Sequence, residues 1–501
     1  MKYQGIKLEI KKAGINGEGI GFYQRKPVFV EGCFPGEVAL CNIYDEGRHD
    51  RGELIKVLKR SKDRIKSPCP HFRKCGGCSL INLNYEKQLE IKKQLLQDAL
   101  YKYAGYNNDI EDVVASTKIY HYRNKCNLPF VEHDGKLVNA IYKQGTNHPT
   151  IIEYCIIHDE KLEELRITIL NILNKYRFRS YVHSKKQGMR QLVLRGFGNE
   201  YQLVLITGND IIDQNVIDEF SKIKELVSIF QGVNIHKNPI RMMPDKLRLL
   251  YGKEKIVINN EDYKLHLSPK AFYQLNHFQA TRIYKDVAKL ITEKCDLLVE
   301  AYCGIGTISM YLADKAEKII GIEIEERAIK DAKENAKLNG FNNMEFIADD
   351  ASAAIRRIVK KKKIDVLIVD PPRTGLDDEL LETLMRTKIK NIVYVSCNPA
   401  TLAKNLAVLQ NKYHIELIRP YDMFPDTSLV ETVCLLNKKN YYQRYVNNEL
   451  ERKDTFKDRI LDETPKFVRE RRLQKKQIIL NKLLPMIIDI SSSKSTISDK
   501  P

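Results

Sequence analysis

The chain has 501 residues, in which 83 Lys and Arg outnumber 65 Asp and Glu and give a formal net charge of +18. The length predicts two or three domains, and the lack of an 18-residue apolar run or an N-terminal signal pattern favours a cytoplasmic protein that neither spans a membrane nor is exported. The charge predicts a polyanionic partner, first of all nucleic acid, although a Lys-rich solvated surface explains it too. Eleven cysteines without an export signal favour metal or catalytic use over disulfides.

Residues 1–62 are predicted to form a small β-barrel. Apolar and polar residues alternate over residues 6–10, 27–30 and 37–40, and glycines break these short runs, as in barrels built from short strands. The barrel is followed by a basic run at residues 56–62. A basic small barrel suits oligonucleotide binding, although a barrel with a purely structural role fits the pattern nearly as well.

Residues 63–265 are predicted to form a central α+β domain. A helix is expected over residues 85–103 and several strands follow, in a pattern that indicates no function. Four cysteines have the spacing of a ligand set, three of them within one ten-residue loop and one far downstream: Cys69, Cys75, Cys78 and Cys155. Such thiolates can surround one centre with tetrahedral sulfur ligation. Zinc and an iron–sulfur cluster fit equally, and a site without metal is the third interpretation.

Residues 266–437 are predicted to form a doubly wound α/β domain, a Rossmann-like sheet. Strand-like apolar runs alternate with helical patterns and end in an antiparallel pair; the runs lie near 297–301, 318–323, 344–347, 365–369, 392–395, 414–418 and 430–436. Residues 438–501 are charged, helical in pattern and serine-rich near their end. They are predicted to form a basic helical or disordered extension of unassigned function.

Acidic residues follow successive strands of this predicted sheet. The glycine-containing turn at residues 300–307 leads from the first strand to a helix, and Glu323 ends the second strand, where an acid can accept both hydroxyls of a ribose. Position 309 is Ser where a dinucleotide fingerprint has a third glycine, so a nucleoside without pyrophosphate, such as S-adenosylmethionine, fits better. Asp350 and Asp370 follow the third and fourth strands. Each acid alone is commonly a helix cap or a solvated loop residue.

Cys397 follows the fifth strand-like run and is a candidate nucleophile. Ligands bind at the carboxyl ends of the strands in a doubly wound sheet, so Cys397 and Asp370 are expected to face one crevice. Taken alone, a free cysteine is more often a small buried hydrophobe. The acids at the neighbouring strand ends favour the catalytic interpretation.

Taken together, the motifs resemble the RNA uracil-5-methyltransferase family, and most closely its branch that modifies 23S ribosomal RNA. The resemblance covers roughly residues 4–437, with the motifs in order. They are the N-terminal barrel, C-x5-C-G-G-C with a later Cys, Ser-Pro-Lys-Ala-Phe-Tyr-Gln-Leu-Asn at 268–276, Tyr-Cys-Gly-x-Gly-Thr at 302–307, Asp-Pro-Pro-Arg at 370–373, Ser-Cys-Asn-Pro-Ala-Thr-Leu at 396–402, and Met-Phe-Pro at 423–425 followed by Glu431.

The resemblance implies a fold, two cofactors and a substrate. The fold is a Rossmann-like methyltransferase domain with an N-terminal TRAM-type barrel and a central α+β domain. A [4Fe-4S] cluster is implied on the four cysteines named above. S-adenosylmethionine is implied to bind Gln274, Tyr302, Glu323 and Asp370, with Asp350 as a further candidate from its strand-end position. The expected partner is RNA, with no membrane and no obligatory protein partner.

A mechanism follows from the resemblance and from the chemistry of uracil. Carbon 5 is a poor nucleophile, so the Cys397 thiolate is expected to add to carbon 6, after which carbon 5 takes the methyl group and Glu431 removes its proton. A thiol needs help to ionise near neutral pH, and Arg373 and the bound sulfonium are the candidates. The family often has His near the Glu431 motif, where this chain reads Phe-Pro-Asp-Thr-Ser-Leu-Val-Glu at 424–431. Proton relay from the base is therefore in doubt.

Three other functions compete with this interpretation. The T-loop uridine of transfer RNA is the alternative substrate for the same chemistry. An amino methyltransferase has a similar Asp/Asn-Pro-Pro turn, but Arg373 stands where that class places an aromatic ring, and its chemistry needs no thiol. A catalytically inactive RNA-binding factor would use only the barrel and the charge, and the strand-end acids with Cys397 argue against it.

Overall fold

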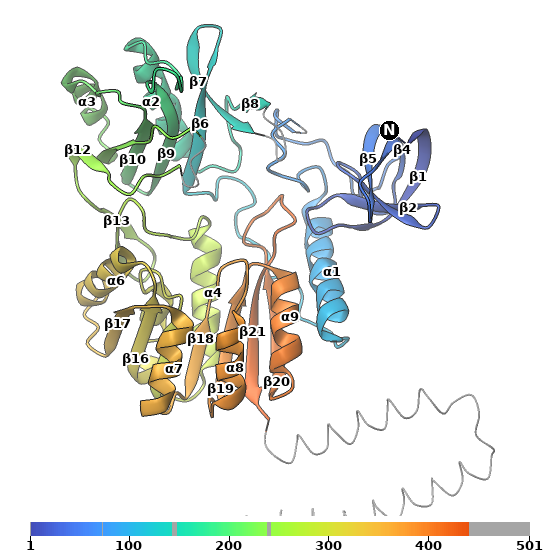
Figure 1. Ribbon diagram of the computed structural model, residues 1–501, viewed down its shortest axis with the longest axis vertical. Helices are drawn as coiled ribbons and strands as arrows, with labels where there is room; N and C mark the ends of the chain where they lie inside the picture. Colours follow the sequence, from blue (N-terminus) through green and yellow to red (C-terminus); the bar gives the residue numbers. More distant parts are fainter. Residues whose placement is uncertain (1, 73, 143–147, 238–241, 440–501) are drawn as a thin grey trace, which may run out of the picture. The chain divides into compact units, whose positions relative to one another are not determined.

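The computed structural model describes residues 2–72, 74–142, 148–237 and 242–439 (Figure 1). The predicted extension at 438–501 lies outside this part of the chain from residue 440 onward. No helix among the described residues combines the length and apolar character that crossing a bilayer requires.

The N-terminal strands close into the predicted barrel. They are β1 (Tyr3–Ala13), β2 (Gly19–Tyr23), β3 (Lys26–Val30), β4 (Val38–Asp45) and β5 (Asp50–Lys59), in the spatial order β1-β2-β3-β5-β4. Alternate residues point inward and form a small apolar core that includes Leu8, Val28 and Ile43. Gly21 permits the close approach of β1 and β2, because a Cβ there would lie 2.6 Å from Leu8 Cγ.

The central region is built on a mixed seven-stranded sheet. Its strands are β6 (Lys125–His133), β7 (Lys136–Tyr142), β8 (Pro149–Ile151), β9 (Met189–Phe197), β10 (Glu200–Thr207), β11 (Leu226–Val233) and β12 (Arg248–Gly252), in the order β12-β11-β10-β9-β6-β7-β8. The helices α2 (Glu160–Lys175) and α3 (Gln214–Ser221) share one apolar core with the sheet. A short hairpin, β13 (Ile256–Asn259) and β14 (Lys264–Leu267), leads to the next domain.

The second seven-stranded sheet has the predicted doubly wound form. Its order is β17-β16-β15-β18-β19-β21-β20, from β15 (Cys295–Ala301), β16 (Ala316–Glu323), β17 (Met344–Ala348), β18 (Val366–Val369), β19 (Asn391–Ser396), β20 (Tyr413–Tyr421) and β21 (Glu431–Lys438). The strand β21 runs antiparallel to both of its neighbours. The order reverses between β15 and β18, and ligands bind outside the carboxyl ends of the strands at such a point.

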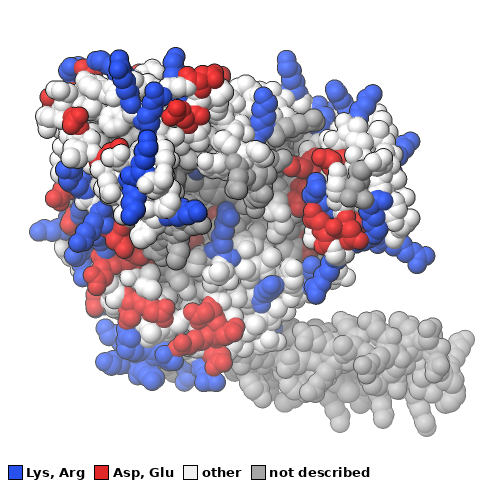
Figure 2. Space-filling model, turned by 45° about the horizontal axis from the view of Figure 1, so that its top comes forward, with Lys and Arg blue, Asp and Glu red and all other residues white. Residues whose placement is uncertain are grey.

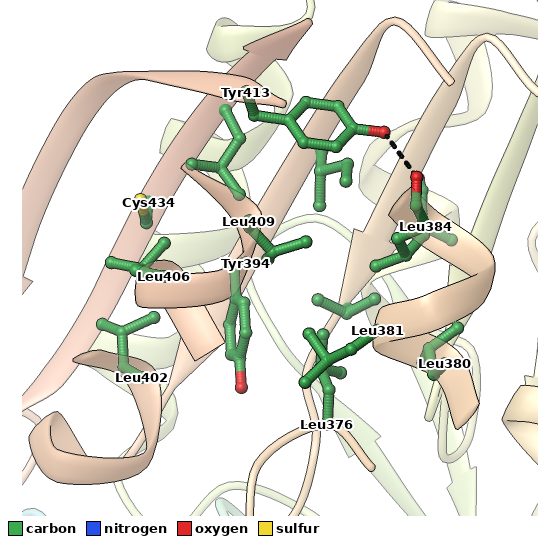
Figure 3. Packing of buried hydrophobic residues seen from close by; sticks show 14 of the residues in the cluster. Leu376, Leu380, Leu381, Leu384, Tyr394, Leu402, Leu406, Leu409, Tyr413 and Cys434 are labelled. Atoms are coloured by element: carbon green, nitrogen blue, oxygen red, sulfur yellow. Dashed lines mark hydrogen bonds between the residues drawn. The ribbon is translucent and has the colours of Figure 1, made fainter. Parts of the chain in front are cut away.

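Helices cover both faces of this sheet (Figure 1). They are α4 (His277–Leu290), α5 (Thr307–Tyr311), α6 (Glu326–Leu338), α7 (Ala351–Lys361), α8 (Asp378–Arg386) and α9 (Pro399–Leu409). Leucines of α8 and α9 pack around Tyr394 of β19 in one buried cluster (Figure 3). The Tyr394 hydroxyl donates to Asn405 Oδ1 (2.9 Å), which also accepts from Leu376 N (2.9 Å). This packing fixes β19 just before Cys397. An earlier helix, α1 (Tyr85–Ala104), packs against α9.

Candidate active site

The turn after β15 brings backbone donors to an acid on β16. Gly304 N donates to Glu323 Oε2 (3.2 Å), and Glu323 Oε1 accepts from Glu325 N (3.1 Å). Tyr302 has φ of 65°, an uncommon conformation for a residue with a side chain. Gly306 is also left-handed, at φ 78°, and a Cβ there would lie 2.9 Å from the ring of Phe346. The sequence thus folds this turn tightly against β16, with Tyr302 and Glu323 side by side.

Tyr302 lies among the acids that the sequence singles out. Burial, together with the negative charges of Asp377, Asp350 and Glu323, raises its pKa to about 12. Three of the five predicted cofactor residues are therefore neighbours. Asp350, however, caps α7, because its Oδ1 accepts from Ala353 N (2.9 Å). The helix-cap interpretation of Asp350 is thus correct, and its predicted contact with a cofactor stays a prediction.

The turns after β18 and β19 are tied together around Cys397. Asn398 caps α9, its Nδ2 donates to Arg373 O (3.0 Å), and Thr401 Oγ1 donates to the same oxygen (3.2 Å). Burial, and after it the charges of Glu431 and Asp370, raise the pKa of the Cys397 thiol to about 11, against the opposing charge of Arg373. Arg373 acts in the expected direction but is outweighed. The expectation that Arg373 and a bound sulfonium together help the thiol to ionise stays a prediction, because the charge of Arg373 alone does not offset the causes that raise the pKa.

Glu431 comes next to Cys397 through strand pairing. It is the first residue of β21, and Thr432 pairs with Ser396 of β19. Glu431 is 5% exposed. Burial and the charge of Asp370 hold its pKa well above the usual range, against the opposing effect of Arg373. Burial also raises the pKa of Asp370 to about 7. This edge of the sheet, called the catalytic crevice below, therefore joins a thiol and two carboxyl groups whose pKa values are all raised.

Gln274 lies in a segment that joins the central sheet to the catalytic edge. Its carbonyl accepts from Asn124 Nδ2 (2.9 Å), and Asn276 Nδ2 donates to Met423 O (3.1 Å). At the other end of the segment, Ser268 Oγ donates to Asp331 Oδ1 (2.7 Å). The segment 268–276 is thus fixed to both domains. The Gln274 side chain is half-buried there.

A cluster of three cations beside this segment was missed from the sequence. Lys125 of β6 pairs in register with Arg195 of β9, and Arg123 precedes Lys125 by two residues. Arg195 donates to Ala271 O (2.7 Å) and Gln202 Oε1 (3.1 Å). Across the described part of the chain, no carboxylate lies within ion-pair distance of the three. The spacing of Arg123 and Lys125 could have predicted part of this cluster, because residues two apart at the start of a strand lie on the same face.

The charge of this cationic cluster is only partly compensated inside the protein. Burial and the neighbouring Arg195 and Arg123 lower the pKa of Lys125 to about 8. Burial likewise lowers the pKa of Arg195 to about 9, although Asp331 opposes this shift. Like charges directly opposite each other on paired strands are destabilising. The cluster therefore fits an anionic ligand.

The four cysteines of the predicted metal site are brought into one region. All four are free and partly exposed. Burial raises the pKa of Cys78 well above its usual range, and the charges of Cys155, Cys75 and Cys69 raise it as well. The four sulfurs are thus electrostatic neighbours. Yet within the described ranges no three His, Cys, Asp or Glu side chains form a group that could hold a metal ion. The donor set fits a thiolate-bound metal in chemistry, and the metal itself stays a prediction.

A basic cavity lies away from Cys397. It has a volume of about 820 Å³ and is formed by the ends of α7 and α8 and the residues that precede β18 and β19. Its cations are Arg356, Lys360, Lys361, Lys362, Lys363, Arg386 and Lys388, with Glu379 and Glu382 among them. Figure 2 shows a dense group of Lys and Arg at the lower end of the visible face. This cavity is at the opposite ends of the strands from the thiol.

Comparison with known proteins gives one consistent family. Residues 84–439 match the family model described as tRNA (Uracil-5-)-methyltransferase. Uncharacterized RNA methyltransferases from Streptococcus agalactiae and Bacillus cereus are 37% and 36% identical over 445 and 449 residues, which is 87% of this chain and 98% and 97% of theirs. The Pyrococcus abyssi tRNA (uracil-54, C5)-methyltransferase, solved with S-adenosyl-L-homocysteine, superposes with a TM-score of 0.70 at 27% identity, covering 86% of this chain and 100% of that one.

Proposed function

The chain belongs to the RNA uracil-5-methyltransferase family, and from this premise we propose that it methylates carbon 5 of a uridine in 23S ribosomal RNA through a covalent adduct on Cys397. RNA uracil-5-methylation with S-adenosylmethionine is the activity of this family. The proposal adds the RNA substrate and the roles of the residues. The observation that carries it is the meeting of Cys397, Glu431 and Asp370 at one sheet edge.

The residues divide the reaction between them. The Cys397 thiolate forms a bond to carbon 6, and the electrons of the carbon 5–carbon 6 double bond move toward carbon 5 and the neighbouring carbonyl. Carbon 5 then takes the methyl group that bound S-adenosylmethionine would supply, and the electrons of the broken sulfur–methyl bond stay on the cofactor's sulfur. The Glu431 carboxylate removes the proton from carbon 5, the double bond re-forms, and the electrons of the carbon–sulfur bond return to Cys397.

The charge of the crevice suits this sequence of steps. With a pKa of about 11, only about one Cys397 thiol in 10⁴ is ionised at pH 7. A sulfonium held near Asp370 and Glu431 offsets their charges and favours the thiolate and the carboxylates. Tyr302, Glu323 and Gln274 are proposed to hold the remainder of the cofactor, with Glu323 on the ribose. Binding of the cofactor thus prepares both the nucleophile and the base.

The cationic cluster is proposed to hold a phosphate of the RNA. A target base must leave its stack to enter the crevice, which costs least in a single-stranded loop. Arg123, Lys125 and Arg195 lie beside the segment that carries Gln274, so a phosphodiester there would fix the backbone next to the flipped nucleotide. The barrel is proposed to act as a TRAM-type module that contacts more distant parts of the RNA.

The four cysteines are proposed to hold a [4Fe-4S] cluster, with zinc as the alternative. Support comes from their gathering in one region, where thiolate charges oppose each other unless a metal binds. The site would stabilise the loop that carries Cys69, Cys75 and Cys78, and no step of the methylation passes through it. Metal analysis with absorbance near 400 nm separates a cluster from zinc, and a protein without either metal would overturn this part.

Transfer RNA is the second candidate substrate, because the Pyrococcus abyssi protein with the same fold acts on tRNA. The test uses S-adenosylmethionine with 23S ribosomal RNA fragments or a tRNA transcript, each containing 5-fluorouridine, which lacks the proton that Glu431 removes. We expect mass spectrometry to find a methylated protein–RNA adduct with the ribosomal fragments, and none with Cys397→Ala. An adduct with tRNA alone would show that tRNA is the substrate. If neither RNA formed an adduct, the proposed role of Cys397 would be overturned.

A further inference from the structure

The loop that delivers Glu431 is held by several distant parts of the chain. This loop, residues 422–430, joins β20 to β21 and is called the base loop here. Outside α1, it forms hydrogen bonds with Val114, whose carbonyl accepts from Asp422 N (3.0 Å), and with the barrel, the cysteine-rich region, the central region and the segment 268–276. Ser428 Oγ donates to Ile15 O (2.9 Å), Leu80 N to Asp426 O (2.8 Å), Tyr122 Oη to Pro425 O (3.2 Å) and Asn276 Nδ2 to Met423 O (3.1 Å).

Two buried polar side chains of helix α1 form an ion pair and hydrogen bonds with the base loop. Lys92 forms an ion pair with Asp422 in which both side chains are fully buried, and its Nζ also donates to Phe424 O (3.0 Å). One turn earlier, Gln88 Nε2 donates to Asp426 Oδ1 (3.0 Å) and Gln88 Oε1 accepts from Asp426 N (2.9 Å). The loop lies beside the upper end of α1 in Figure 1.

These contacts are poorly explained by stability alone. Burying two charges costs several kcal/mol per ion, and replacing such a pair with apolar residues is often neutral or stabilising. Lys92 does fix the orientation of the base loop, because it contacts both a side chain and a backbone carbonyl of this loop. Gln88 does the same at Asp426. Asp426 occupies the region where the family often has His, and here its carboxylate is turned toward α1 rather than used at the base.

We propose that Lys92 and Gln88 are positioning residues that hold the base loop so that Glu431 reaches the proton on carbon 5. The inference rests on the proposed role of Glu431 as the base. Only two residues separate Ser428 from Glu431, whereas Cys397 is held by Asn398, Arg373 and the α9 core and not by the base loop. A shift of the base loop therefore affects proton removal and leaves addition of the thiol and transfer of the methyl group largely intact.

This separation predicts a kinetic signature. If proton removal becomes slow, the methylated adduct between Cys397 and an ordinary uridine RNA accumulates before the thiol is expelled. A misplacement of about 1 Å can slow a step by about 100-fold, so we expect elimination to slow by at least about tenfold. A role in folding alone would instead lower every step and the amount of folded protein together.

The experiment compares Lys92→Met and Gln88→Leu with wild type and with Lys93→Met. Lys93 is the next residue of α1, and its ion pair with Asp112 (2.6 Å) is on the surface. Each protein reacts with S-adenosylmethionine and unmodified RNA, is denatured at set times, and the methylated protein–RNA adduct is measured by gel and mass spectrometry. We expect the adduct to accumulate in the two α1 variants and not in wild type or Lys93→Met.

Two results would overturn the inference. In the first, Lys92→Met and Gln88→Leu fold with thermal midpoints close to that of wild type, yet adduct formation and turnover fall equally. In the second, both variants turn over at the normal rate. If Lys92→Met does not fold, the result for Gln88→Leu alone tests the inference, because this variant keeps the Lys92–Asp422 ion pair. Wild type with 5-fluorouridine RNA is the parallel control: no adduct there would refute the proposed function itself, whatever the α1 variants do.

Discussion

The catalytic crevice is acidic and the cationic cluster is basic, but in both of them ionisable groups are buried next to groups of like charge. In the crevice, burial and neighbouring acids raise the pKa values of Asp370, Glu431 and Cys397. In the cluster, burial and neighbouring guanidiniums lower the pKa of Lys125. Both regions thus shift toward neutrality, which is what buried like charges do without a counter-ion. The comparison teaches that each region suits a ligand of opposite charge, for which the proposed function supplies a sulfonium in one and a phosphate in the other.

Removing the thiol should have the largest effect. We expect Cys397→Ala to lower the methylation rate by at least about 10⁴-fold, because the loss of a nucleophile removes the covalent route altogether. Calorimetric affinity for S-adenosylmethionine should stay near that of wild type. Cys295→Ser is the matched control, since Cys295 is a half-buried thiol at the opposite end of β15. Full activity in Cys397→Ala would return the chain to the amino-methyltransferase interpretation.

Removing one cation of the cluster should separate RNA binding from stability. We expect Lys125→Gln to weaken RNA binding by about tenfold and to reduce the slope of log affinity against log salt by about 0.7. The thermal midpoint should rise or stay constant, because a like-charge contact with Arg195 is relieved. Lys136→Gln, an exposed change on β7, controls for loss of net charge. A lower midpoint with unchanged RNA affinity would make Lys125 a structural residue.

The acidic crevice should also make the stability of the protein depend on pH. Asp370 has a folded pKa of about 7, above its unfolded value, so its contribution to stability is present at low pH and is lost as the pH rises through 7. The lowered pKa of Lys125, about 8, acts oppositely, increasing stability as the pH rises above 8. We expect the thermal midpoint to fall between pH 5 and 7.5, and to fall less in Asp370→Asn. Bound S-adenosylmethionine should reduce this fall of the thermal midpoint. If the midpoint of Asp370→Asn fell as steeply with pH as that of wild type, the raised pKa of Asp370 would be refuted.

The smallest expected effect is at Asp350. Asp350→Ala removes the cap of α7 and should cost about 1 kcal/mol of stability, whereas Asp350→Asn keeps a capping oxygen. We expect both variants to bind S-adenosylmethionine about threefold more weakly, the worth of one hydrogen bond at an exposed site. Thermal melts and calorimetry measure the two effects separately. Unchanged affinity in both variants would leave Asp350 with the capping role alone.

The amino-acid sequence by itself determined the barrel, the doubly wound sheet and the turns that carry Tyr302, Glu323, Asp370 and Cys397. These follow from local patterns, since an apolar run followed by a polar turn places its residues at a strand end wherever the strand lies in the sheet. The sequence of the central region shows no comparable motif. Its cations act together only because β6 and β9 pair in register.

Tertiary structure alone decided the electrostatics of the site. Glu431 lies beside Cys397 because β21 pairs antiparallel with β19, and its charge adds to burial in raising the pKa of the thiol. The grip of Lys92 and Gln88 on the base loop joins residues more than 300 positions apart. Burial and charge depend on distances across the fold, and a local pattern contains no information about those distances.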